Sequence, residues 1–147
     1  MKTISNEANA VPTYLGAEPT QRFTNYYPSW IDNLAHDVTL EGSLMDGAVQ
    51  GGDAVRNILV AIRSFYDEQQ FNFVGPCGNN GWLEDYIARV RGEPIGCVVV
   101  VSRNAHGETH HIAANYRPRS SLLLLSRLVG EHFAGTPYGE HFAPNDS

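Results

Sequence analysis

The chain has 147 residues, the usual size of one domain and enough to bury a hydrophobic core without a metal or disulfide. Its formal net charge of −6 argues against a nucleic-acid partner, because phosphates require a basic surface. No apolar run approaches the ~20 residues of a membrane span, so we expect no membrane partner. Residues 1–10 are polar, unlike a secretion signal, which predicts a cytoplasmic protein.

The first half of the chain predicts helices with a strand between them. Residues 1–20, interrupted by prolines and a glycine, predict an irregular arm. Pro28 precedes a short predicted helix at 29–36, and residues 38–41 predict a strand ended by glycine. A longer helix is predicted from Asp53, the candidate N-cap, to about residue 68, because apolar residues recur there at helical spacing: Val55, Leu59, Ile62 and Tyr66.

The second half predicts strands joined by tight turns. After a strand at 71–74, three strands follow in hairpin order at 82–91, 97–103 and 109–116, separated by turns rich in glycine. A leucine-rich helix then begins at Ser120 or Ser121, ends near Phe133, and precedes a polar tail at 136–147. Helices packed on one antiparallel sheet predict the α+β class, with the domain spanning 21–135.

Several short segments, in this order, resemble the SnoaL-like branch of the nuclear transport factor two superfamily. They span about residues 28–133 and are Leu40-Glu41-Gly42, Gly51-Gly52-Asp53-Ala54-Val55-Arg56, the turn at 104–107, and Asn115-Tyr116-Arg117-Pro118. The resemblance implies a cone-shaped, curved antiparallel sheet packed with helices around a central pocket. It also implies frequent dimers and a wide range of functions, from ketosteroid isomerases, cyclases and dehydratases to binding modules, so fold alone does not assign one.

The resemblance also implies where the ketosteroid isomerases of this fold carry their catalytic groups. The general base falls on Gly42, and the protonated acid that stabilises the oxyanion falls on Val99 or Val101. The tyrosine donor comes from a first helix that this chain lacks in recognisable form, and Tyr26 and Tyr27 are candidates to cover the pocket instead. We therefore do not expect ketosteroid isomerase chemistry, and whether the protein is an enzyme is left open.

The same registration predicts which side chains face the pocket. Glu84 on the first long strand faces an apolar interior, which would raise its pKa. His110 on the last strand is close enough in this registration to form an acid/base pair with it, between Tyr86 and Tyr116. The alternative places Glu84 at a solvated strand end or beside an arginine, because lone buried carboxylates are rare.

Aromatic and aliphatic side chains predict a pocket for a small hydrophobic ligand. The candidate ligand-binding residues are Trp30, Tyr66, Trp82, Tyr86, Ile112 and Tyr116. The alternative is that most of these rings fill the core. His110 and His111 are adjacent on a strand and point to opposite faces, so they do not chelate one ion, and we expect neither a metal nor a cofactor.

The outer face of the sheet predicts a homodimer. Leu83, Ile87 and the valine-rich strand would leave apolar surface in water, which a second copy would cover. Arg89 and Arg91 beside Asp85 would then form pairs across subunits, or a solvated face. Cys77 and Cys97 are expected to be reduced, with a disulfide as the alternative.

Two functions follow from these observations. The first is binding of a small hydrophobic molecule in the cone pocket, without catalysis or with an activity still to be assigned. The alternative is a cofactor-independent acid/base enzyme of the isomerase, cyclase or dehydratase type that uses Glu84 and His110.

Overall fold

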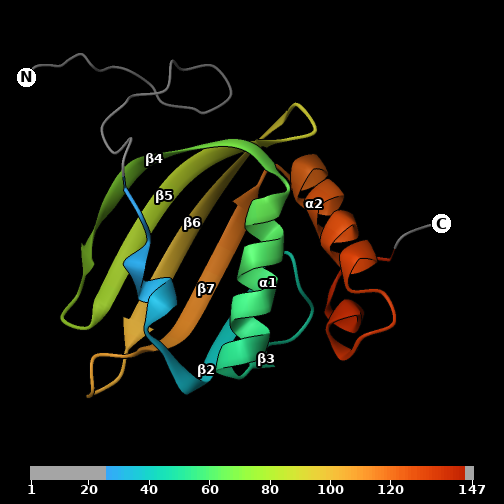
Figure 1. The fold of residues 1–147 in the computed structure, drawn as a ribbon. Helices are drawn as coiled ribbons and strands as arrows, with labels where there is room; N and C mark the ends of the chain where they lie inside the picture. Colours follow the sequence, from blue (N-terminus) through green and yellow to red (C-terminus); the bar gives the residue numbers. More distant parts are fainter. Residues whose placement is uncertain (1–25, 145–147) are drawn as a thin grey trace, which may run out of the picture.

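The computed structural model describes residues 26–144, so the predicted arm at 1–20 and the end of the tail lie outside the described residues. Within this range one curved sheet is covered on one face by helices (Figure 1). The elements are η1 (Ser29–Asp32), β2 (Leu34–Gly42), β3 (Val49–Gln50), α1 (Gly52–Ser64), β4 (Tyr66–Cys77), β5 (Gly81–Val90), β6 (Glu93–Arg103), β7 (Thr109–Arg117), α2 (Arg119–His132) and η2 (Pro137–His141).

The sheet has the strand order β3-β2-β7-β6-β5-β4. Strands β4 to β7 form an antiparallel meander, as the alternation and the tight turns predict. Strand β2 pairs with β7 in parallel, with Leu40 opposite Ile112. A parallel pair needs a long connection, and the intervening helix and meander provide it. The α+β class is confirmed, with a mixed sheet rather than a wholly antiparallel one.

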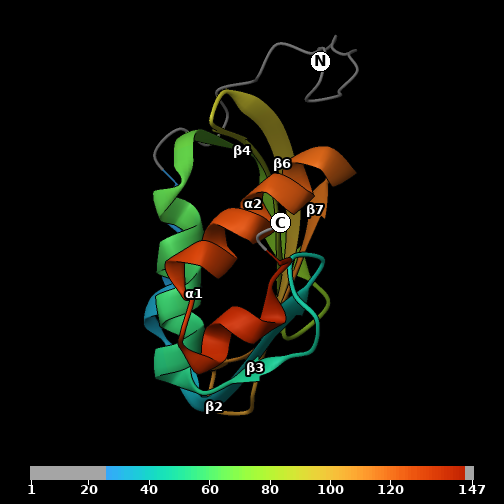
Figure 2. The same ribbon diagram turned by 90° about the vertical axis from the view of Figure 1, so that its right-hand side faces the viewer.

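The two α-helices cover the same side of the sheet and close the core. Helix α1 buries its apolar stripe, which consists of Val55, Ile58, Ala61 and Ile62, and lies across β2. Helix α2 packs against α1, β6 and β7 (Figure 2). Neither helix, nor any other in the described part of the chain, is long and apolar enough to cross a membrane.

The structure corrects the ends of two predicted helices. Residues 29–36 do not form a helix, because only Ser29–Asp32 form a 3-10 turn and β2 begins at Leu34, opposite Thr109. The helix predicted to residue 68 ends at Ser64, and Tyr66 pairs with Val90 at the start of β4. In both places pairing with a distant strand overrides local helical preference. Asp53 is also not the cap, which is Gly51 without a side-chain hydrogen bond.

Charged side chains on the outer face pair within the chain. Arg117 Nη2 lies 3.1 Å from Asp85 Oδ1, and Arg89 Nε lies 3.1 Å from Glu68 Oε2. Leu83 and Ile87 on this face are half-buried. The homodimer through this face stays a prediction. Both cysteines are free thiols, Cys77 exposed and Cys97 buried.

Candidate functional site

Glu84 is a buried carboxyl group on the inner face of β5. It alternates with Trp82 and Tyr86 on this face, and it is 1% exposed. Its cross-strand neighbours are Val99 on β6 and, one strand further, Ala114 on β7. The carboxyl group therefore faces the apolar side of the sheet, where hydration does not stabilise its charge.

Two donors from the segment before β2 and one from β5 itself meet at this carboxyl group. Trp30 Nε1, on η1, donates a hydrogen bond to Glu84 Oε2 at 2.8 Å, and the Tyr26 hydroxyl donates to the same oxygen. The Tyr26 oxygen in turn accepts a hydrogen bond of 2.8 Å from Trp82 Nε1. We call these four residues the Glu84 cluster. Trp82 is also a side-chain hydrogen-bond partner of Glu84 itself.

Burial and hydrogen bonding act in opposite directions on the acidity of Glu84. Desolvation is the larger effect and raises the pKa of Glu84, whereas hydrogen bonds from Tyr26, Trp30 and Trp82 lower it by stabilising the carboxylate. Desolvation also raises the pKa of Tyr26, and its bond to Glu84 adds to this. Tyr26 therefore stays a protonated donor, and Glu84 is the member of the cluster whose proton exchange is shifted to higher pH by burial.

Glu84 lines a cavity of about 50 Å³ beneath η1 and α1. That volume holds a few water molecules and is well below what an aromatic ring needs. Its wall is mostly apolar and aromatic, and it runs outward to the exposed side chain of Arg63. The other lining residues are Pro28, Trp30, Ile31, Leu59, Ile62, Gln69, Phe71, Tyr86, Val99, Ile112, Ala114 and Tyr116.

A second polar cluster lies beside the first on the inner face. The Tyr66 hydroxyl is 2.6 Å from the Tyr86 hydroxyl and donates to the Tyr116 hydroxyl at 3.5 Å. Cys97 lies between Tyr86 and Tyr116 in the strand pairing. Burial raises the pKa of the Cys97 thiol to about 12, although hydrogen bonds from Tyr86 and Tyr116 oppose this. These four residues, the tyrosine cluster, bond to one another.

The structure brings most of the predicted ligand-binding residues to one cavity. Trp30, Tyr86, Ile112 and Tyr116 line it together with Glu84. Trp82 instead donates a hydrogen bond to Tyr26. Tyr66 is hydrogen-bonded to Tyr86, which lines the cavity. The alternative reading also has support, because these same side chains belong to the buried core.

His110 is the predicted site residue that the structure places elsewhere. The β6–β7 register shifts between the Ser102–His111 and Arg103–Thr109 pairs, so His110 is an extra residue that interrupts the alternation. Its side chain is 52% exposed, with Nε2 3.9 Å from Asp37 Oδ2. The predicted Glu84–His110 pair therefore does not form.

His111 faces outward, as predicted, and joins a polar group on the outer face. Its Nδ1 lies 2.6 Å from Thr39 Oγ1, and its Nε2 lies 3.1 Å from Glu41 Oε2. No group of three His, Cys, Asp or Glu side chains that could hold a metal ion occurs between residues 26 and 144.

The positions where the sequence resemblance places isomerase catalytic groups hold a tightly packed glycine and two buried valines. A Cβ atom on Gly42 would lie 1.8 Å from the Ala114 carbonyl oxygen, so a side chain there requires the backbone to move. Val99 and Val101 are both buried, and Val99 lines the cavity. The carboxyl group of this cavity comes from β5 instead.

The donors to Glu84 were not predicted from the sequence. Tyr26 was predicted only as part of a pocket cover, and Trp30 only as a ligand contact. A signal was present, because a buried carboxyl group requires donors and the aromatic segment around Pro28 precedes the first strand. The hydrogen bonds from this segment to Glu84, however, join residues that are more than fifty positions apart in the chain.

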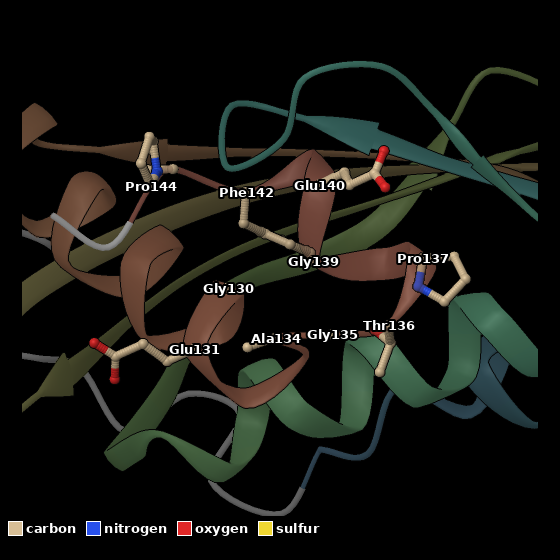
Figure 3. Close-up of a pocket in the computed structure, with 11 residues that line it drawn as sticks. Gly130, Glu131, Ala134, Gly135, Thr136, Pro137, Gly139, Glu140, Phe142 and Pro144 are labelled. Atoms are coloured by element: carbon tan, nitrogen blue, oxygen red, sulfur yellow. The ribbon is translucent and has the colours of Figure 1, made fainter. Parts of the chain in front are cut away.

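A larger hollow of about 650 Å³ lies at the end of α2 and along η2 (Figure 3). Its lining is mostly glycine, alanine and proline, and Glu131 and Glu140 are its charged members. Neither carboxyl group is buried there. The hollow therefore lacks convergent polar groups, and the cavity at Glu84 is the better candidate site.

Comparison with known structures identifies the fold. An uncharacterized protein with a cystatin-like fold from Silicibacter pomeroyi superposes with a TM-score of 0.67 at 16% identity, over 72% of this chain and 74% of that one. A steroid delta-isomerase from Pseudomonas aeruginosa also gives 0.67 at 16% identity, over 73% and 79% of the two chains. An NTF-2 like protein of unknown function from Burkholderia xenovorans gives 0.51 at 13% identity, over 61% and 73%.

The chain has the nuclear transport factor two-like fold. The resemblance in the sequence is thus confirmed for the fold. No protein-family model matches the sequence, and no curated protein matches it. At these identities the likeness extends to the fold alone, so a function has to be argued from the cavity at Glu84.

Proposed function

We propose that this protein binds a small, mostly apolar molecule in the cavity beside Glu84. The observation that supports the proposal most directly is the Glu84 carboxyl group, which is 1% exposed and lines this cavity. An ionised carboxyl group accepts about four hydrogen bonds, so a ligand can donate to it in addition to Tyr26, Trp30 and Trp82. The apolar wall binds the rest of the molecule.

The dimensions of the cavity limit the ligand. About 50 Å³ accommodates only a few atoms, so a ligand of more than this size displaces side chains at the exposed end, near Arg63 and Gln69. The inner end is fixed by the hydrogen bonds of the Glu84 cluster and by the strands beneath it. We therefore expect polar recognition at Glu84 and steric adjustment at the exposed end.

A second candidate is acid/base catalysis by Glu84 without His110. The raised pKa of Glu84 favours it, because a carboxyl group that titrates nearer to neutral pH can accept and return a proton. Tyr26 and Trp30 would then hold the carboxyl group in position through Oε2 while it exchanges a proton with the substrate in the cavity. No second ionisable group from residues 26–144 is hydrogen-bonded to Glu84 apart from Tyr26, so binding is the function that the geometry supports best.

Tryptophan fluorescence tests the binding proposal. The chain has two tryptophans, and both belong to the Glu84 cluster, so their emission reports on this site. We expect isobutanol at millimolar concentration to shift the emission saturably. A flat titration would refute the proposal.

A matched pair of variants locates the binding. Ala114→Val adds two methyl groups at the cavity wall, whereas Ala113→Val makes the same change on the adjacent residue of β7, which does not line the cavity. We expect Ala114→Val to weaken isobutanol binding and Ala113→Val to leave it unchanged. Equal weakening by both would place the binding elsewhere.

A further inference from the structure

The chemical character of the cavity at Glu84 is that of a carboxyl group among aromatic rings. Rings of Trp30, Phe71, Tyr86 and Tyr116 contribute to its wall. Tyr26 packs edge-on against Phe71 and stacks beside Trp82, with centroids 4.7 and 6.5 Å apart. Aromatic rings around an acidic group are the usual surroundings of a bound organic cation, because ring faces and carboxylate both attract positive charge.

The charge of Glu84 lacks a cationic partner within the described part of the chain. The ion pairs of residues 26–144 all lie on other carboxylates: Asp32, Asp37, Glu41, Glu68 and Asp85. The three donors around Glu84 are neutral hydroxyl and indole groups. Buried carboxylates are normally paired with a cation, so the charge of Glu84 is uncompensated within residues 26–144.

The remaining charge near the cavity lies at its outer end. Arg63 is the cationic side chain among the lining residues, and it is exposed. Solvent screens its charge more strongly than a charge at the buried end beside Glu84. The inner end of the cavity is therefore the negative end.

We propose that the ligand is a small organic ammonium ion whose nitrogen donates to the Glu84 carboxyl group and whose alkyl group occupies the aromatic cavity. This inference rests on the proposed function and specifies its ligand class. The ammonium group would compensate the charge of Glu84, while Trp30 and Tyr26 hold Oε2. A neutral alcohol of the same shape can donate a hydrogen bond but does not compensate the charge.

Isobutylamine and isobutanol test this difference because they share one carbon skeleton. An alkyl ammonium group has a pKa of about 10.4, so isobutylamine is a cation at about pH 8. We expect isobutylammonium to shift tryptophan emission with an affinity at least about tenfold higher than that of isobutanol, as one charge-assisted hydrogen bond provides.

Variants of Glu84 decide whether this preference arises at the cavity. Glu84→Gln keeps an acceptor for Trp30 and Tyr26 but removes the charge, so we expect the two ligands to bind it about equally. Glu84→Asp keeps the charge and should retain part of the preference. Glu41→Gln makes the same chemical change on an exposed carboxylate and should retain all of it. Circular dichroism and thermal unfolding identify any variant that fails to fold.

Each outcome separates the two proposals. If isobutanol binds and isobutylammonium binds no better, the ammonium inference is overturned and the proposed function stands. If neither ligand binds, both are overturned. An ammonium preference that persists in Glu84→Gln, or disappears in Glu41→Gln, also overturns the inference, because the cation then binds outside the cavity.

Discussion

The Glu84 cluster and the tyrosine cluster lie side by side on one face of the sheet, yet they differ in charge. In the tyrosine cluster, three hydroxyl groups and a thiol, all neutral, serve as one another's partners. In the Glu84 cluster, neutral donors surround a carboxyl group that has no cationic partner among residues 26–144. A neutral network stabilises a core, whereas a buried carboxylate without a cation leaves a charge to be compensated.

The first way to test this comparison concerns the apolar part of the Glu84 cluster. Trp30 is 8% exposed and donates to Glu84, so Trp30→Ala should lower the free energy of unfolding by about 3–5 kcal/mol in urea denaturation. Val60→Ala on the exposed side of α1 is the control and should change it by less than about 0.5 kcal/mol. Similarly small decreases in the free energy of unfolding of both variants would mean that Trp30 does not contribute to the hydrophobic core.

The second test concerns the tyrosine cluster. Tyr66→Phe removes the hydroxyl that joins Tyr86 to Tyr116, and we expect it to lower the free energy of unfolding by about 1–3 kcal/mol. Tyr138→Phe is the matched control, since the described residues form no hydrogen bond to that hydroxyl, and it should have little effect. Isobutanol binding should be nearly unchanged in Tyr66→Phe. A large loss of binding with intact stability would contradict the division between the clusters.

The third test uses pH. Burial raises the folded-state pKa of Glu84 above its ordinary value of 4.5, so the unfolded chain loses this proton first as pH rises. The free energy of unfolding of the wild type, relative to that of Glu84→Gln, should therefore decrease as pH rises from about 4.5 to the folded-state pKa of Glu84. Above that pKa the difference between the two proteins should stay constant. Urea denaturation across this range measures the difference. Glu41→Gln should follow the wild type, and a wild-type curve parallel to Glu84→Gln would indicate an unburied carboxyl group.

The smallest expected effect on stability concerns the two thiols. Cys77 is exposed, whereas Cys97 is buried with its pKa raised to about 12, which leaves almost no thiolate. A disulfide reagent should titrate one thiol in the native protein, none in Cys77→Ser, and two in denatured wild type. Cys77→Ser should change the free energy of unfolding by less than about 0.5 kcal/mol. Rapid labelling of Cys97 would show that the tyrosine cluster opens readily.

Local sequence patterns were sufficient to predict much of the fold and one part of the candidate site. Turn residues and alternation predicted the strands at 82–91, 97–103 and 109–116, because each turn and each period of two depends on neighbouring residues. The same alternation placed Glu84 and Tyr86 on one face, and the family resemblance implied that this face is the inner one. The alternation holds along β5 because the β5–β6 pairing continues without a shift.

Contacts between distant segments decided the rest. The shift in β6–β7 pairing that turns His110 outward depends on how two whole strands align, and no local pattern near His110 reveals it. Tyr26 and Trp30 reach Glu84 only because the first described residues cross the inner face of a sheet formed later in the chain. The sequence by itself thus determined the strands of the meander and the alternation that puts Glu84 and Tyr86 on one face of β5. The tertiary structure decided where the first helices end and which donors meet Glu84, because both depend on packing between segments far apart in the chain.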